Sequence, residues 1–167
     1  MTDRRYSPET RPGPKTAGKA PWAAPTPSGP LHARVTVPGS KSLTNRELVL
    51  AALADGPSRL RAPLHSDDSA RMIDALRLLG VGVDIERGEG DVGDDLLVTP
   101  VAPFAGGSVI DCGQAGTVMR FVAPLAGFAE GEVTMTAHET ALHRPMGEMI
   151  KALRDVGVDI DDGGHWA

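Results

Sequence analysis

Apolar residues recur along the chain in two rhythms, and together these rhythms predict an α/β fold. Short alternating or apolar stretches predict strands, which we place at residues 32–37, 58–64, 81–85, 96–99, 108–112, 133–137 and 158–160. Longer stretches with a helical apolar period predict helices, at residues 42–54, 66–79, 117–126 and 145–156. Residues 87–94 form an acidic, glycine-rich loop between two strands.

The helices differ in how their apolar residues are distributed. Residues 48–54 are apolar on every side, which predicts a fully buried first helix. The second helix should begin after an N-cap at Ser66, with Asp67 and Asp68 at the positive end of its dipole. Its core face should carry four apolar residues, namely Met72, Ile73, Leu76 and Leu79. Pro145 suits the first position of the last helix.

Two parts of the chain repeat each other. Residues 72–81 and 149–158 are identical at seven of ten positions, at an offset of 77. Each copy follows a strand, and that strand follows a more apolar helix. We therefore predict duplicated units of the order strand, helix, strand, helix, strand, strand, packed side by side. The second unit is incomplete, and because Ala167 falls inside it we expect the sequence to be a fragment.

Composition and charge limit the function classes. Seven of the fourteen prolines lie in residues 1–30, which we interpret as a disordered tail with a net charge of +3. The remainder carries −8, which argues against nucleic acid as a partner. No apolar run reaches the length of a membrane span. The single Cys112 excludes an internal disulfide and fits a reducing compartment, so we expect a cytoplasmic protein.

The segment between the first strand and the first helix has the features of an anion site. A turn at Pro38-Gly39 allows a helix to begin, and free N–H groups at a helix start favour phosphate or carboxylate. Lys41, Ser42 and Arg46 add two cations and a hydroxyl. A simple helix cap with solvated charges is an equally good interpretation of this spacing. A P-loop is excluded, because Ser40 separates the glycine from the lysine.

Two further helix starts carry similar features. Residues 113–120 form a glycine-bounded turn followed by a helix, with Gly116, Thr117 and Arg120 at its beginning. Arg144 immediately precedes the last helix, where a guanidinium can clamp a carboxylate or phosphate. Each feature alone is explained by a tight turn or an exposed arginine. Because side-by-side repeats bring such edges together, we expect these basic residues to converge on one anionic site.

The same segments resemble a known family. Residues 38–46 are similar to the motif Pro-Gly-Ser-Lys-Ser-x-Thr-Asn-Arg of 5-enolpyruvylshikimate-3-phosphate synthases. Residues 114–120 resemble the family's Asn-Ala-Gly-Thr-x-x-Arg motif, with Gln114 in place of the usual Asn. Residues 66–68 and 144–146 resemble its Ser-Asp-Asp and Arg-Pro-Met segments. The resemblance runs from about Pro30 to Ala167.

The resemblance implies both a fold and an activity. The fold would be the inverse αβ barrel of enolpyruvyl transferases, with residues 31–40 as strand and crossover from the other domain. Residues 41–167 would be under two of the three repeats in one domain. The activity would be enolpyruvyl transfer from phosphoenolpyruvate to shikimate-3-phosphate, in the shikimate pathway to chorismate and aromatic amino acids. The missing C-terminal half would carry the acid and base groups, so we expect this chain alone to be inactive.

The implied roles concern substrate binding. Lys41 would contact both substrates and is the one candidate for a catalytic role, while Ser42 and Arg46 would bind the shikimate phosphate. Gly116 and Arg144 would line the phosphoenolpyruvate pocket, with Thr117 and Arg120 beside them. No cofactor or metal is implied.

Two alternatives stay open. A fragment of a UDP-sugar enolpyruvyl transferase would have Asn at position 42 and a cysteine in a mobile loop, whereas Cys112 ends a predicted strand. A free-standing module that binds anions without chemistry would share the basic cluster. His138 and His143 lack the further ligands that a metal site needs.

Overall fold

The computed structural model describes residues 24–35, 37, 39–88 and 93–164. The chain divides into two units, Met1–Val35 and Thr36–Ala167, and each is described by itself. Residues 24–35 and 37 contain neither helix nor strand, so the strand predicted at residues 32–37 is not formed there. A strand needs a hydrogen-bonded neighbour, and the side chains of Val35 and Val37 are exposed. Most of the predicted tail, residues 1–23, lies outside the described residues.

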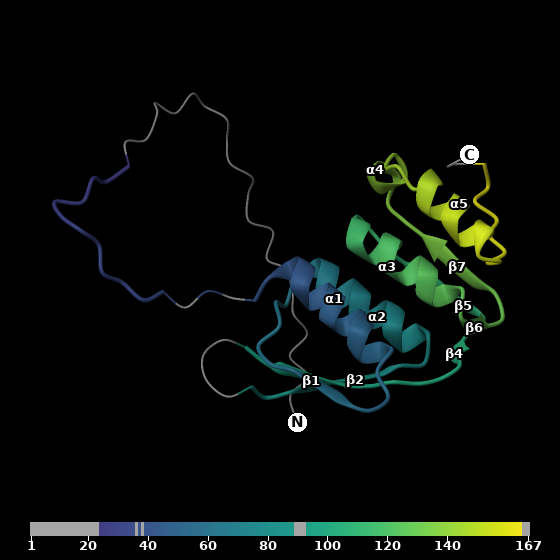
Figure 1. Cartoon of the computed structure of the whole chain (residues 1–167), viewed down its shortest axis with the longest axis horizontal. Helices are drawn as coiled ribbons and strands as arrows, with labels where there is room; N and C mark the ends of the chain where they lie inside the picture. The colour runs from purple at the N-terminus through teal and green to yellow at the C-terminus, as the bar shows by residue number, and fades with distance from the viewer. Residues whose placement is uncertain (1–23, 36, 38, 89–92, 165–167) are drawn as a thin grey trace. The chain divides into compact units, whose positions relative to one another are not determined.

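The first repeat of the second unit combines two helices with an antiparallel sheet (Figure 1). Its helices are α1 (Lys41–Ala52) and α2 (Asp67–Leu78), and its strands are β1 (Ser58–Leu60), β2 (Gly82–Glu86) and β3 (Asp95–Thr99). β3 lies in the middle of the sheet and pairs with both neighbours. Val98 of β3 stands opposite Ser58 on one side and Val83 on the other.

The second repeat contains shorter strands joined in parallel. Its strands are β4 (Phe104–Ala105), β5 (Ser108–Asp111), β6 (Ala129–Glu130) and β7 (Val133–Thr136), with the helices α3 (Gly116–Ala126), α4 (Glu139–Leu142) and α5 (Gly147–Asp155). β5 pairs with β7, and β4 pairs with β6. Because α3 connects the parallel strands β5 and β7, this part is a strand-helix-strand crossover.

Helices α1, α2 and α3 pack against one another, and each contacts the other two (Figure 1). The four residues predicted for its core face are all buried. Ser66 accepts a hydrogen bond from the Ser69 backbone N–H, which confirms the predicted cap. The helices of the two repeats thus share one core, as the duplicated pattern predicts. The described residues contain no helix long and apolar enough to cross a membrane.

The prediction that the first helix is buried on all sides is wrong. In α1, Leu48 is fully buried but Leu43 and Leu50 are exposed, and Leu53 just beyond the helix is also exposed. The helix packs against α2, α3, β1 and β3. These neighbours cover only part of its circumference. An apolar sequence makes a helix suitable for burial on every side, but it does not determine whether other elements cover every side.

Several predicted boundaries also differ from the structure. β1 ends at Leu60 rather than residue 64, because Ala62 has φ +46°, outside the strand region. α5 begins at Gly147 after an N-cap at Met146, so Pro145 precedes the helix. Residues 158–160 form no strand. The short elements β4, β6 and α4 were not predicted, since two to four residues carry too little periodicity.

Candidate anion-binding site

Helices α1 and α3 begin differently from α2. Their N-cap residues, Ser40 and Ala115, make no side-chain cap hydrogen bond, and neither first turn contains an acidic residue. In α2, by contrast, Ser66 and Ser69 form a reciprocal capping box, and Asp67 and Asp68 lie between them in the first turn. In α1 and α3, therefore, neither a capping side chain nor an acidic residue of the first turn neutralises the free N–H groups and their partial positive charge. These are the two helix starts that the sequence predicts as anion sites.

The entry into α1 is fixed by a close backbone approach. A β-carbon on Gly39 would stand 2.9 Å from the Ala62 carbonyl oxygen and 3.0 Å from the Leu64 nitrogen. Only glycine fits there without a shift of backbone. The buried Thr44 hydroxyl accepts a hydrogen bond of 2.9 Å from the Leu64 N–H. The first turn of α1 is thus held against the segment that leads into α2.

The predicted cations of α1 have defined partners. Lys41 Nζ lies 3.1 Å from Asp68 Oδ2 in the first turn of α2, with both side chains partly exposed. Arg46 Nη1 donates to the Ser42 carbonyl oxygen at 3.1 Å. The Arg46 guanidinium also lies 5.7 Å from the centre of the Phe121 ring, which is a cation–π distance. Phe121 belongs to α3, so this contact joins the two repeats.

A second contact joins the same helices closer to their starts. Asn45 is fully buried, and its Nδ2 donates to Thr117 Oγ1 at 2.7 Å. Thr117 directly follows Gly116 at the beginning of α3. The first turns of α1 and α3 therefore lie beside each other.

Arg120 and Arg144 both lie at the beginning of α3. A β-carbon on Gly116 would overlap the Arg144 guanidinium and would stand 3.0 Å from Arg120 Nη1. Arg120 donates to the carbonyl oxygens of Gly116 and Pro145, each at 3.3 Å. Two guanidinium groups thus lie close to the amides of an uncapped helix start, which favours an anion with several oxygen acceptors.

The turn before α3 is held by an ion pair across the repeats. Arg71 of α2 donates to Asp111 Oδ2 at 2.6 Å, and Asp111 Oδ1 accepts from the Gly113 N–H at 2.8 Å. These two interactions, the Gly113 hydrogen bond foremost, lower the pKa of Asp111 below its ordinary value. Gly113 has φ +51° and lies against the Arg71 guanidinium, so a side chain there would be both strained and obstructed. Gln114 is exposed on this turn.

Cys112 faces the core and takes no part in this cluster. It is buried, and burial raises the pKa of its thiol to about 11. The thiol is therefore neutral at physiological pH, as expected for a small packing residue rather than a nucleophile.

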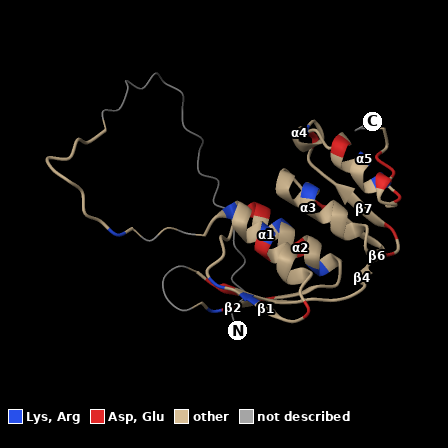
Figure 2. Cartoon of the chain, viewed as in Figure 1, with Lys and Arg blue, Asp and Glu red and all other residues tan. Residues whose placement is uncertain are grey.

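The structure brings together the residues that the sequence predicts. Asn45–Thr117 and Arg46–Phe121 connect α1 to α3, and Arg144 lies against the first residue of α3. In Figure 2, basic positions mark the start of α1 and the first half of α3. Lys41, Ser42 and Arg46 thus lie on the helix next to the one that carries Gly116, Thr117 and Arg120.

Sequence reasoning missed four residues of this arrangement. Asp68 was interpreted as a helix cap without a partner, and Asn45, Arg71 and Phe121 were not singled out. One signal was available for Asn45: it lies three residues before Leu48 and seven before Ala52, so helical spacing places it on the same face as these apolar residues. The contacts of Arg71 and Phe121 depend on tertiary packing and leave no sequence signal.

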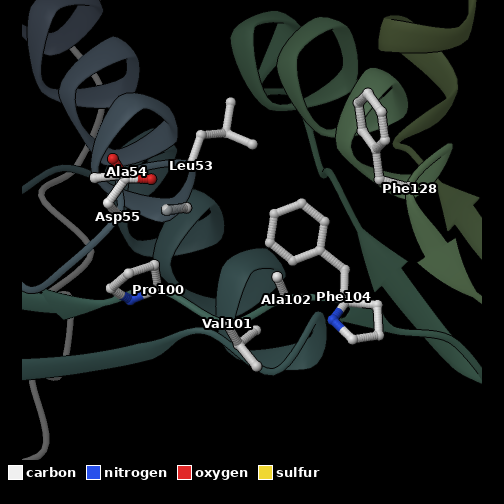
Figure 3. Close-up of a pocket in the computed structure, with 10 residues that line it drawn as sticks. Leu53, Ala54, Asp55, Pro100, Val101, Ala102, Phe104 and Phe128 are labelled. Atoms are coloured by element: carbon white, nitrogen blue, oxygen red, sulfur yellow. The ribbon is translucent and has the colours of Figure 1, made fainter.

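Two surface pockets lie away from these residues. One, of about 600 Å³, is lined mainly by apolar residues at the other end of α1, including Leu53, Phe104 and Phe128 (Figure 3). The other, of about 390 Å³, lies beside Glu47, Leu50 and Arg59. Neither contains a predicted site residue.

The described residues contain no group of three or more His, Cys, Asp or Glu arranged to hold a metal ion. His138 instead caps α4, where its Nδ1 accepts from the Thr140 N–H at 3.2 Å.

Comparisons with known proteins identify the family. The family profile described as EPSP synthase (3-phosphoshikimate 1-carboxyvinyltransferase) matches residues 25–165. A 3-phosphoshikimate 1-carboxyvinyltransferase of Kocuria rhizophila is 51% identical over 150 residues, covering 87% of this chain and 34% of that protein. The chain thus spans about a third of the length of this curated relative.

Solved structures show the same similarity. An EPSP synthase from Acinetobacter baumannii matches with a TM-score of 0.65 and 26% identity, over 78% of this chain and 30% of its own. A second structure of EPSP synthase from that organism matches with a TM-score of 0.63 and 27% identity, over 74% and 27%. The fold is therefore an incomplete enolpyruvyl-transferase fold, and the chain belongs to the EPSP synthase family.

Proposed function

We propose that this chain forms part of the substrate site for enolpyruvyl transfer from phosphoenolpyruvate to shikimate-3-phosphate. The observation that carries the proposal is that two uncapped helix starts, each bearing basic residues, are joined by the Asn45–Thr117 hydrogen bond. Arg144 lies against Gly116, and α1 is joined to the next residue of α3 through Asn45. Two phosphorylated, carboxylated small molecules need such a cluster, because the body of the chain is acidic.

The proposed roles are those that the family resemblance implies, and the chemistry of each group suits them. Ser42 and Arg46 bind the phosphate of shikimate-3-phosphate, with the amides of the first turn of α1. Gly116 and Arg144 line the phosphoenolpyruvate pocket, next to Thr117 and Arg120. Lys41 lies at the start of α1 and contacts both substrates as a point charge.

The reaction joins the substrates by addition and elimination. The shikimate hydroxyl attacks protonated phosphoenolpyruvate, and phosphate leaves the tetrahedral adduct. The basic residues of this chain stabilise the negative charge of both phosphates by electrostatic interactions. The groups that transfer protons belong to the rest of the enzyme, in keeping with a chain that spans about a third of its relative.

The domain arrangement is part of the same proposal. Residues 41–167 form under two of three repeats of one domain. Residues 31–40 are the crossover from the other domain, and they would form a strand only on pairing with it. The missing C-terminal half is the partner that completes the site. We place the protein in the cytoplasm, where its proposed substrates are metabolised.

Calorimetric titration of the 167-residue chain with shikimate-3-phosphate tests the proposal. We expect saturable binding that Lys41→Met and Arg46→Gln weaken. Lys151→Met is the matched control, since Lys151 pairs with Asp155 on α5 and lies outside the cluster. Binding of a UDP-sugar in place of shikimate-3-phosphate would favour the related transferase. Equal binding by Lys41→Met and Lys151→Met would contradict the proposed site.

A further inference from the structure

Asn45 is a buried polar residue of α1. It is fully inaccessible to solvent, and its Oδ1 accepts no hydrogen bond within the described part of the chain. A buried acceptor without a donor costs free energy of folding. An apolar side chain of similar size would avoid this cost, so stability does not explain an asparagine here.

The one hydrogen bond that Asn45 makes points to another explanation. Its amide donates at 2.7 Å to the Thr117 hydroxyl, which belongs to the other repeat. On α1, Asn45 lies between Lys41 and Arg46. On α3, Thr117 lies between Gly116 and Arg120. The hydrogen bond therefore connects the two helix starts at the level of their basic residues.

The neighbouring contacts make this bond the main polar link between the helix starts. Thr44, also buried, bonds to Leu64 within the first repeat and does not reach α3. Arg46 reaches α3 only through the Phe121 ring, and a cation–π contact fixes distance more than orientation. A short hydrogen bond between two buried or half-buried side chains restricts both position and rotation.

We propose that Asn45 is a positioning residue that holds the anion-binding starts of α1 and α3 in register through Thr117. Asn45 need not contact a substrate. It sets the spacing between the group bound by α1 and the group bound by α3. This inference rests on the proposed function, because the spacing matters only if both helix starts bind parts of one substrate pair.

A double variant separates positioning from stability. Asn45→Leu with Thr117→Val removes both polar partners while keeping their approximate size, so the free energy of unfolding should not fall. Thr117→Ser keeps the hydroxyl and should therefore keep the hydrogen bond to Asn45 and the helix orientation. Val98→Ala, in the buried centre of β3, is a control that lowers stability without touching this link.

Residual dipolar couplings of the backbone amides measure the orientation of α1 relative to α3 without any ligand. We expect the double variant to change this orientation, and Thr117→Ser and Val98→Ala to retain it. Calorimetry with shikimate-3-phosphate should then show an affinity about tenfold lower for the double variant. Should the double variant not fold, Thr117→Val alone gives the same comparison.

Different results contradict the positioning role of Asn45 and the proposed function. An unchanged orientation in the double variant, or in Thr117→Val, overturns the proposal even if affinity falls, because Asn45 would then act by direct contact. If the natural chain does not bind shikimate-3-phosphate, the proposed function fails. The couplings still decide whether the hydrogen bond sets the helix orientation.

Discussion

The Arg144 guanidinium lies against the backbone of Gly116, in the space that a β-carbon would occupy. This approach brings into contact two segments that were singled out separately in the sequence. Gly116→Ala should displace Arg144, and a lost charge-assisted hydrogen bond weakens anion binding by about tenfold or more. Alanine is the better helix former, so stability should not decrease.

Titration with shikimate-3-phosphate and phosphoenolpyruvate, alongside urea denaturation, checks this prediction. Gly56→Ala is the matched control, because a β-carbon on Gly56 meets no atom within 4 Å. Anion affinities that are equal in Gly116→Ala and Gly56→Ala would show that Arg144 takes no part in binding.

Lys41→Met should separate binding from stability. The Lys41–Asp68 ion pair is partly exposed, and such pairs contribute about 0–1 kcal/mol, so the free energy of unfolding should change little. In the complete enzyme the same substitution should severely reduce turnover, because the charge between the substrates is lost.

The isolated chain should release no phosphate from phosphoenolpyruvate in the presence of shikimate-3-phosphate, as measured by a phosphate assay. Turnover by the purified 167-residue chain would mean that the proton-transfer groups lie within it. For the previous prediction, a turnover rate of the complete enzyme that Lys41→Met leaves unchanged would show that Lys41 is only a solvated cation.

Much of the fold could be predicted from local patterns. The core face of α2 and its cap at Ser66 were predicted correctly, because both depend on residues a few positions apart. The absence of a strand over the described residues 32–35 and 37 and the exposure of Leu50 could not be predicted, because alternation and apolar character do not specify a partner. Pro145 was wrongly placed inside α5, since its fixed φ suits both a helix start and the residues before it.

The candidate site was predictable only in part. The apolar period of the sequence locates the helix starts, and these carry Lys41, Arg46 and Arg144. The packing of α1 beside α3 was indicated by the repeats. The contacts that Asn45 and Arg46 make with Thr117 and Phe121 could not be predicted, because they join positions 72 and 75 residues apart.

Leu76 and Leu78 provide a matched pair within α2. Leu76 is fully buried between α1 and α3, whereas Leu78 is 45% exposed. Leu76→Ala should lower the free energy of unfolding by about 2–5 kcal/mol, because it leaves a cavity between packed helices. Leu78→Ala should change it by less than about 1 kcal/mol. Urea denaturation measures both, and similar midpoints would show that α2 is not central to the core.

Asp111 should contribute to acid sensitivity. Its pKa in the folded state lies below the ordinary value of 3.8, chiefly because of the Gly113 N–H and Arg71. A depressed pKa stabilises the fold above the ordinary value, and this contribution is lost as the pH falls through the folded-state pKa. Asp111→Asn should therefore unfold at lower denaturant concentration at pH 7 and depend less on pH below about pH 4.

Arg71→Gln removes the same ion pair from the other side and should reproduce part of this loss at pH 7. Denaturation midpoints measured between pH 7 and pH 2 provide the comparison. An identical pH dependence of Asp111→Asn and the natural chain would show that the carboxylate is not held by these partners in solution.

Cys112 should resist alkylation as long as the chain is folded. The side chain is 1% exposed, and burial raises the pKa of its thiol to about 11, so the reactive thiolate is scarce at neutral pH. Mass spectrometry after iodoacetamide treatment should find Cys112 unmodified in buffer and modified in concentrated urea. Above the thiol's ordinary pKa of 9.0, the unfolded chain ionises first, so stability should fall as the pH rises further. Cys112→Ala should lack this alkaline destabilisation. Rapid alkylation of the folded chain would contradict the prediction, because it would place the thiol on the surface beside the Gln114 turn.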